Sequence, residues 1–255
     1  MYSRPRIIPC LLLDENNGLV KTIQFKKPRY IGDPINAVKI FNNKGVDELC
    51  ILGITITKRN SEISWELLED IATEAFMPLS YGGGVRTLDD VKRLFSIGYE
   101  KVIFDTAIFT NPKLIEDSVA YAGSQSIVAS IDVKSNLLSK SSCWIQCGTK
   151  NTKDAPASVA RKVESLGVGE ILLNSIDRDG MMNGYDLNLV KSVVESVSIP
   201  VIACGGAGSI EDINKVIQDG HAHAAAAGSV FVYYGRNRAI LITYPGEEEL
   251  KDRAI

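Results

Sequence analysis

Two glycine-rich turns are the strongest candidates for a ligand site. Residues 81–85 read Tyr-Gly-Gly-Gly-Val and residues 204–209 read Cys-Gly-Gly-Ala-Gly-Ser, and each stretch follows an apolar run and precedes a helical pattern. Glycines at such a turn allow backbone N–H groups to face an anion. A further short stretch with a hydroxyl side chain follows one predicted strand later in each case. We therefore expect two phosphate cradles, the first built from Gly83, Gly84 and Thr106 and the second from Gly205, Gly206, Gly228 and Ser229.

The alternative interpretation of these glycines is that they only permit tight turns and close packing. Phosphate sites after the last two strands recur in eight-stranded α/β barrels, which favours a ligand at the second cradle. At the first cradle, Asp105 would place a carboxylate beside a bound anion. Both interpretations therefore remain open for the first cradle.

Acidic residues follow two further apolar runs. Asp132 lies near the end of the run at 127–133, and Asp177, Asp179 and Gly180 follow the run at 170–173. A carboxylate held at such a strand end can act as a general acid or base. An Asp-rich loop with a glycine can equally be a turn that leads into the next helix. We favour catalysis for Asp132 and leave both roles open for Asp177 and Asp179.

Four charged residues stand at the opposite ends of four predicted strands. They are two cations, Arg6 and Lys101, and two anions, Glu48 and Glu170. In a closed barrel these side chains would converge around the axis at the base and form alternating ion pairs. From the residue types alone, a structural plug is the favoured interpretation, because the N-terminal face of such barrels usually serves stability.

A metal site is conceivable from the imidazoles of His221 and His223 and the thiols of Cys143 and Cys147. Their spacing matches no standard zinc site. We therefore expect neither a metal nor a cofactor.

These candidate residues are positioned by an alternation of strands and helices. Helical patterns at 33–43, 65–75, 88–97, 157–166, 186–197 and 210–218 separate most of the apolar runs, which predicts parallel strands with helical crossovers. Continuous apolar strands in about 250 residues match a (βα)8 barrel, and a doubly wound open sheet is the alternative. The apolar runs lie at 7–13, 49–54, 77–80, 101–104, 127–133, 170–173, 201–204 and 222–227.

An internal repeat favours the barrel. Residues recur at an offset of 122, so that Glu48 matches Glu170, Asp90 matches Asp212, and Gly83-Gly84 match Gly205-Gly206. Two similar halves of four βα units make an eightfold barrel with approximate twofold symmetry. We expect a single domain over residues 1–255.

The composition restricts the class of protein. The chain has 255 residues, of which 45% are hydrophobic and 23% charged, with a net charge of -3 and five cysteines without a CxxC pair. No apolar run is long enough to span a bilayer or to act as a signal peptide, and no basic patch suits a nucleic acid. We therefore expect a cytoplasmic protein with reduced thiols that binds neither membrane nor nucleic acid.

Several of these motifs together resemble the HisF family, the cyclase subunits of imidazole glycerol phosphate synthase. The resemblance extends over nearly the whole chain. It rests on Arg-Ile-Ile-Pro-Cys-Leu at 6–11, Gly-Asp-Pro at 32–34, Gly-Gly-Gly at 82–84, Ser-Ile-Asp-Arg-Asp-Gly at 175–180, Gly-Tyr-Asp at 184–186 and Gly-Gly-Ala-Gly at 205–208.

The resemblance implies partners and residue roles. In this family a HisH-like glutaminase subunit at the N-terminal barrel face releases ammonia, which travels along the axis to a bis-phosphate substrate. It implies an ammonia gate formed by Arg6, Glu48, Lys101 and Glu170, which replaces the structural plug as the favoured role. It also implies substrate binding by Lys21 and catalysis by Asp132.

Three positions depart from the family pattern. Leu12 stands where the first catalytic aspartate is expected, Asp105 replaces an asparagine that helps to bind the second phosphate, and Gly53 replaces an acid. A leucine can act neither as a base nor as an acid. The resemblance therefore leaves intrinsic cyclase activity in doubt.

The Leu-Leu-Leu stretch at 11–13 is similar instead to the WbuZ-type HisF-like proteins of bacterial sugar amidation. This similarity implies a glutamine amidotransferase subunit that supplies ammonia for a surface-polysaccharide or flagellar sugar, with a sugar amidotransferase as a further partner and a phosphorylated small molecule as ligand. One alternative is a genuine cyclase in histidine biosynthesis. Another is a non-catalytic ammonia conduit and scaffold.

Overall fold

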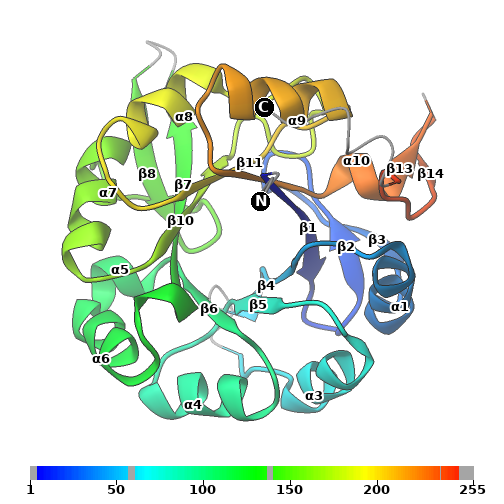
Figure 1. The fold of residues 1–255 in the computed structure, drawn as a ribbon, viewed down its shortest axis with the longest axis horizontal. Coiled ribbons are helices and arrows are strands. Elements are labelled where there is room, and N and C mark those ends of the chain that lie inside the picture. Colours follow the sequence, from blue (N-terminus) through cyan, green and yellow to red (C-terminus); the bar gives the residue numbers. More distant parts are fainter. Residues whose placement is uncertain (1–4, 57–60, 137–139, 236, 247–255) are drawn as a thin grey trace, which may run out of the picture.

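The computed structural model describes residues 5–56, 61–136, 140–235 and 237–246. In this part of the chain eight parallel strands form a closed barrel, because β7 pairs with β10 and completes the circle. The hydrogen-bonded order is β1 (Arg6–Leu13), β4 (Leu49–Gly53), β5 (Leu79–Gly82), β6 (Lys101–Phe104), β7 (Ile127–Ser135), β10 (Glu170–Ser175), β11 (Val201–Cys204) and β12 (Ala224–Ala227). Figure 1 views this barrel from the N-terminal ends of its strands.

Helices surround the strands as an outer ring (Figure 1). The helices are α1 (Pro34–Lys44), α3 (Trp65–Glu74), α4 (Leu88–Ser96), α5 (Ala107–Thr110), α6 (Pro112–Ala122), α7 (Pro156–Ser165), α8 (Leu187–Val194), α9 (Ile210–Gln218) and α10 (Ser229–Val232), with a 3-10 turn at Ser124–Ser126. The sequence predicted a (βα)8 barrel with a twofold internal repeat, and the closed barrel confirms this fold class. The open-sheet alternative is excluded because no edge remains between β7 and β10.

The internal repeat is visible in how equivalent helices begin. Thr87 and Asp90 form a capping box at the start of α4, and Ser209 and Asp212 form the same box at the start of α9. Both helices bury residues at matching positions, Val91 and Leu94 in α4 and Ile213 and Val216 in α9. The offset of 122 residues therefore relates equivalent elements in the two halves.

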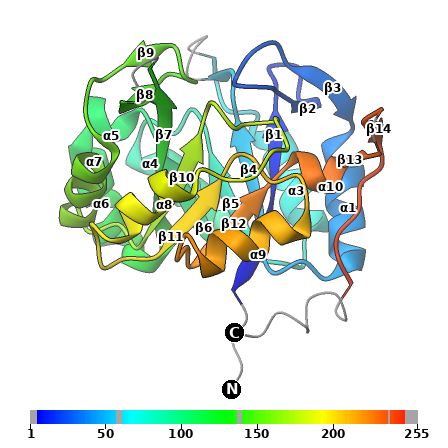
Figure 2. The same ribbon diagram turned by 90° about the horizontal axis from the view of Figure 1, so that it is seen from above.

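Two antiparallel hairpins extend the barrel at the C-terminal ends of its strands. β2 (Leu19–Lys21) and β3 (Arg29–Gly32) continue from β1, while β8 (Ser141–Ile145) and β9 (Lys150–Asn151) continue from β7. Figure 2 shows both hairpins above the same end of the barrel. A third, smaller hairpin of β13 (Tyr233–Tyr234) and β14 (Ala239–Ile240) follows α10.

Buried residues separate into two clusters by the alternation of each strand. On β1, Ile7, Leu11 and Leu13 pack toward the helices in the larger cluster, whereas Ile8, Cys10 and Leu12 belong to the smaller one. This smaller cluster draws side chains from seven of the barrel strands and fills the interior. The interior is thus a packed, largely apolar core, with a different kind of site at each of its two ends.

Candidate functional site

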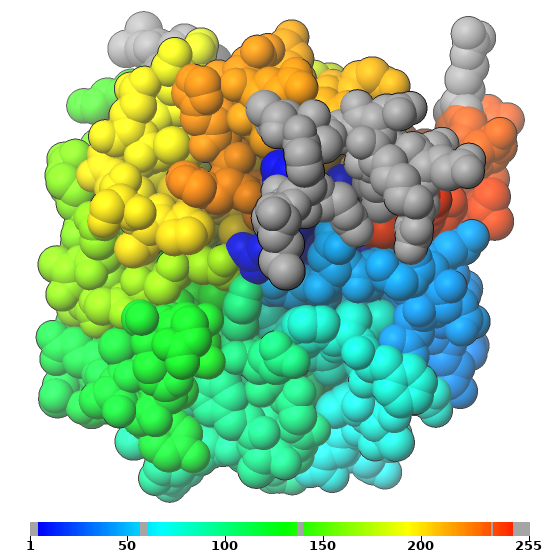
Figure 3. Space-filling model, viewed as in Figure 1, coloured from blue at the N-terminus to red at the C-terminus, as the bar shows by residue number. Residues whose placement is uncertain are grey.

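Four charged side chains close the N-terminal end of the barrel. Arg6 donates to Glu48 over 2.6 Å and also contacts Glu170. Lys101 Nζ lies 2.9 Å from Glu48 Oε2 and 2.7 Å from Glu170 Oε2. Each cation therefore binds both carboxylates, so the four charges meet as a closed ring. Figure 3 shows this face, where the described chain begins (blue) near the centre.

The ring is only partly open to solvent. The side chain of Arg6 is 32% exposed, whereas those of Glu48 and Glu170 are 5% and 11% exposed. Burial alone would lower the pKa of Arg6, but attraction and hydrogen bonds from Glu170 and Glu48 raise this pKa above its ordinary value. Arg6 consequently keeps its charge on the solvent side of the ring, with the carboxylates of Glu48 and Glu170 beneath its guanidinium.

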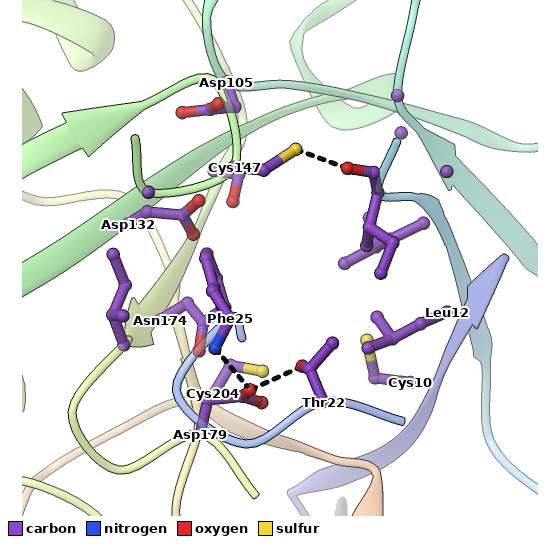
Figure 4. A pocket seen from close by; sticks show the side chains of 18 of the residues that line it. Cys10, Leu12, Thr22, Phe25, Asp105, Asp132, Cys147, Asn174, Asp179 and Cys204 are labelled. Carbon is purple, nitrogen blue, oxygen red and sulfur yellow. Dashed lines mark hydrogen bonds between the residues drawn. The ribbon is translucent and has the colours of Figure 1, made fainter. Parts of the chain in front are cut away.

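A pocket of about 850 Å³ occupies the opposite end of the barrel (Figure 4). Its wall includes residues from every one of the eight barrel strands, so the pocket lies on the barrel axis. The candidate residues from the sequence that line it are Asp132, Lys21, Gly83, Gly84, Thr106, Asp179, Gly180, Gly205, Gly206, Gly228 and Ser229.

Lys21 supplies a cation to the second cradle. Its amino group donates to the backbone oxygen of Cys10 over 2.7 Å and lies directly against the backbone of Gly228. A side chain at position 228 would overlap this amino group and displace it, so glycine there leaves room for Lys21. The same part of the pocket is lined by Ser229 and by the turn at Gly205 and Gly206. These two glycines have positive φ. Glycine backbone, a hydroxyl and an ammonium group together are suited to an anion such as phosphate.

The first cradle also has positive-φ glycines and a hydroxyl, but its surroundings differ. The side chain of Ile56 lies against Gly84, and the Thr106 hydroxyl is already engaged with two partners. It donates to Asp105 Oδ2 over 3.0 Å and accepts from the Gln146 backbone N–H over 3.1 Å. The first cradle therefore has a carboxylate and an apolar side chain beside it.

This asymmetry predicts unequal anion binding. In a crystal soaked in sulfate or phosphate, we expect an anion beside Gly205, Gly206 and Gly228 and a weaker or empty site at the first cradle, because Asp105 repels an anion. Lys21→Met should reduce this occupancy. The matched control is Lys26→Met, since Lys26 also lines the pocket but its amino group binds Gln24. Equal occupancy of both cradles, or occupancy of the first alone, would contradict the prediction.

Asp132 lies within a buried acidic group at the top of the barrel. It is 7% exposed, and Asn174, its partner in the β7–β10 register, hydrogen-bonds to its carboxyl group. Burial and the charge of Asp105 raise the pKa of Asp132 well above its ordinary value. Burial likewise raises the pKa of Asp105 to about 7, despite hydrogen bonds from Thr106. A buried carboxyl group whose pKa is raised in this way is suited to donating and accepting protons.

The raised pKa of Asp105 predicts a pH-dependent stability. The folded chain holds the Asp105 proton more tightly than the unfolded chain, so this residue costs stability progressively as pH rises from about 4 to about 7. Asp105→Asn should therefore increase the free energy of unfolding more at pH 8 than at pH 5, by on the order of 2 to 3 kcal/mol. Denaturant unfolding at both pH values measures this difference. The exposed Asp89→Asn serves as control, and an equal gain at both pH values would contradict the prediction.

Asp177 and Asp179 hold loops together. The carboxylate of Asp177 accepts the Ser135 backbone N–H over 2.7 Å, and Asp177 does not line the pocket. Asp179 accepts from the Thr22 hydroxyl over 2.7 Å and from the Phe25 backbone N–H over 3.4 Å (Figure 4). Gly180 has a positive φ and lies against Thr22, which excludes a side chain. This loop therefore locks the β2–β3 hairpin over the pocket.

Leu12 and Asp132 occupy opposite walls of the pocket. Figure 4 shows Leu12 on the far side from Asp132, next to Cys10. Leu12 pairs with Leu52 on β4 and with Val20 on β2, so apolar residues surround it. The wall facing Asp132 therefore offers no acid or base at this position.

The cysteines are free thiols, as the sequence predicted. Cys10 and Cys50 lie on neighbouring strands with their sulfur atoms 4.0 Å apart, and the Cys147 thiol contacts the backbone oxygen of Ile54. Within the described ranges, no group of three or more His, Cys, Asp or Glu side chains could hold a metal ion. His221 and His223 are exposed just before β12, and His223 Nδ1 accepts the Val201 N–H over 3.2 Å.

Sequence reasoning missed three parts of the pocket. In the sequence, Asn174 appeared only as part of a motif. It lies two residues after Leu172, which faces the barrel interior, and this spacing could have predicted that Asn174 faces the pocket. Gln146 and Cys147 come from the β8–β9 hairpin, whose turn over the pocket has no local signal.

No helix of the described residues is long and apolar enough to cross a membrane.

Comparison with known proteins agrees with this architecture. The model of the histidine biosynthesis protein family matches residues 6–238. A Pseudomonas aeruginosa protein, provisionally named imidazole glycerol phosphate synthase subunit hisF2, is 48% identical over 97% of this chain and 98% of its own length. A Leptospira borgpetersenii protein provisionally named as the subunit HisF is 49% identical over 95% of each chain, and a Vibrio vulnificus protein provisionally named subunit hisF3 is 45% identical over 97% of this chain and 95% of its own. The chain therefore belongs to the histidine biosynthesis protein family and is a barrel of the HisF type.

Proposed function

We propose that this chain is the ammonia-using subunit of a glutamine amidotransferase that serves the amidation of a bacterial surface-polysaccharide or flagellar sugar. The single observation that carries the proposal is Leu12 in the pocket wall opposite Asp132. Cyclisation and cleavage of the histidine-pathway substrate need an acid and a base on opposite sides of the substrate. Only one of these two carboxylates is available across this pocket.

The N-terminal ring supports the entry of ammonia at that end. A ring of two cations and two anions can open by exchanging partners, because each charge keeps one opposite charge while another contact breaks. An apolar plug of the same size would pass a polar molecule only at a desolvation cost of several kcal/mol. Beyond the ring, the interior contains small side chains, including Ala224, Ala226 and Ser80. Arg6, Glu48, Lys101 and Glu170 act in this proposal as the ammonia gate.

The same face presents an apolar anchor for a partner. Phe76 is 90% exposed and lies in the turn from α3 to β5, at the N-terminal ends of the strands. Its backbone N–H donates to Asn42 Oδ1 over 2.9 Å, which fixes the turn beneath it. A large aromatic side chain held out on a rigid turn is the kind of residue that dominates protein interfaces. We assign it to contact with a HisH-like glutaminase subunit.

Partner binding tests this assignment. With the HisH-like glutaminase of the same organism, we expect Phe76→Ala to weaken the complex on the order of tenfold or more, which corresponds to about 1.4 kcal/mol per tenfold. Titration calorimetry gives the affinity. The control is Tyr234→Ala, which removes a 66% exposed aromatic from the β13–β14 hairpin. Failure of the unmodified chain to bind the glutaminase at all would contradict the proposed function.

The rival function is a genuine cyclase in histidine biosynthesis. It is favoured by the names of the similar proteins and by the presence of Asp132 and Lys21 in the pocket. In that case another group would replace the missing acid. The third alternative is a non-catalytic ammonia conduit and scaffold, whose phosphate loops would bind a regulatory anion or nothing.

A further inference from the structure

Two buried oxygen atoms in the pocket lack a hydrogen-bond partner. Within the described residues, Asp105 Oδ1 and Asn174 Oδ1 are both shielded from solvent and accept no hydrogen bond. Asn174 is only 8% exposed, lines the pocket and hydrogen-bonds to Asp132, so its free carbonyl oxygen lies beside that carboxyl group. Leaving a buried acceptor unsatisfied costs about 1 to 3 kcal/mol. Acceptors without donors, gathered in one pocket, indicate a ligand that donates.

The lysines and the arginine that line the pocket form no ion pair with these carboxyl groups in the part of the chain that the structure describes. None of the ion pairs between described residues includes Asp105 or Asp132. The Lys21 amino group lies against Gly228 and binds Cys10, and the Lys134 amino group lies over the Trp144 ring, 5.1 Å from its centroid. The two carboxyl groups influence one another, as the contribution of Asp105 to the raised pKa of Asp132 indicates. A donor that also carries positive charge would satisfy both groups.

We propose that Asp105, Asp132 and the Asn174 carbonyl oxygen form a binding site for a small cation with N–H donors, namely an ammonium ion or a protonated primary amine. Such a cation has three or four donors and no acceptor, which complements the free Asn174 carbonyl oxygen and the Asp105 carboxylate once it is ionised, above its pKa of about 7. The twin cradle around Lys21 and Gly228 has the opposite charge. The pocket therefore takes an anion at one wall and a cation at the other, in contrast to a symmetric bis-phosphate site.

Asp105 is central to this site. Its equivalent by the internal repeat is Ala227, which precedes Gly228, so the acid has no counterpart in the other half. The site rests on the geometry of the isolated barrel and does not require the proposed glutaminase or sugar pathway. Its ligand has two sources, free ammonium and the amino group of a larger molecule, which share the same chemistry.

Thermal unfolding of the isolated chain with different chloride salts tests the site. At pH 8 and equal concentration, we expect ammonium or methylammonium to raise the melting temperature by about 5 °C relative to potassium and tetramethylammonium. An effect of ammonium alone identifies free ammonium as the ligand, because it shows that the site has no room for a carbon substituent. An equal effect of methylammonium identifies an amine group.

Variants locate the effect. Asp105→Asn should abolish the ammonium-specific shift, and this variant is expected to fold because it removes a buried charge. Asp89→Asn is the control, since Asp89 is exposed and does not line the pocket. Equal shifts with potassium and tetramethylammonium, or an unchanged shift in Asp105→Asn, would overturn the proposal. Because no partner protein is present, such a failure is distinct from failure of the proposed function.

Discussion

Purified protein supplied with ammonium salts and the bis-phosphate substrate of histidine biosynthesis is expected to show little or no cyclase turnover. Each acid or base group typically contributes about 10² to 10⁴-fold to the rate of such a reaction. Leu12 removes one of two such groups, and the apolar residues around it, Leu52 and Val20, offer no substitute. Asp105 adds a second defect because it opposes a phosphate at the first cradle.

Steady-state kinetics of product formation measure this loss. Leu12→Asp should recover only part of the activity, since Asp105 remains, and Leu12→Asp combined with Asp105→Asn should recover more. The control is Leu12→Asn, which introduces a polar side chain of the same size as aspartate without a base. Turnover by the unmodified chain on the order of 1 per second, typical of an ordinary enzyme, would refute the sugar-amidation proposal.

The second large effect is expected at the N-terminal ring. Lys101→Met should leave the fold and partner binding intact while it lowers glutamine-supported product formation on the order of tenfold. Lys101 binds both Glu48 and Glu170. Its removal leaves Arg6 as the only cation of the ring, so the two carboxylates have no second cation with which to exchange when the ring opens. Ammonia added to the solution can enter at the open pocket. The ammonia-supported rate should therefore change differently from the glutamine-supported rate.

The measurement compares glutamine-supported and ammonia-supported rates in the reconstituted complex. Lys39→Met is the matched control, because Lys39 forms a 3.2 Å ion pair with Glu74 that is exposed and away from the axis. A structural plug predicts another outcome, in which the melting temperature falls and both rates decline together. That outcome would show that the four charges are structural and do not form an ammonia gate.

The fold was predictable because its pattern is local and repeated. Each of the eight apolar runs became a barrel strand, and the boundaries moved most at β5, which was predicted at 77–80 and lies at Leu79–Gly82. Tyr81 and Gly82 extend this strand because they pair with Ile51 and Leu52 on β4. On their other side they also pair with β6. Helix α8 ends at Val194, although its apolar pattern continues to Val197, because the following turn leads into β11.

The pocket was only partly predictable because many of its contacts join distant residues. The sequence identified Asp105 and Thr106, but the bond from Gln146 to Thr106 spans 40 positions and depends on the β8–β9 hairpin. The placement of Lys21 against Gly228 likewise follows from the β2–β3 hairpin folding across the barrel. Charge spacing predicted the ring at the other end, since inward-facing positions at the starts of barrel strands must converge on the axis.

The most direct test of the central claim is the destination of the glutamine amide nitrogen. The chain, the HisH-like glutaminase and a sugar amidotransferase of the same organism are incubated with amide-¹⁵N glutamine, a nucleotide-linked sugar and the histidine-pathway bis-phosphate together. Mass spectrometry then locates the label in the products. We expect ¹⁵N in an amidino group of the sugar, with none in an imidazole ring and a loss of labelled sugar when the barrel is omitted. Label in the imidazole product, with none in the sugar, would contradict it.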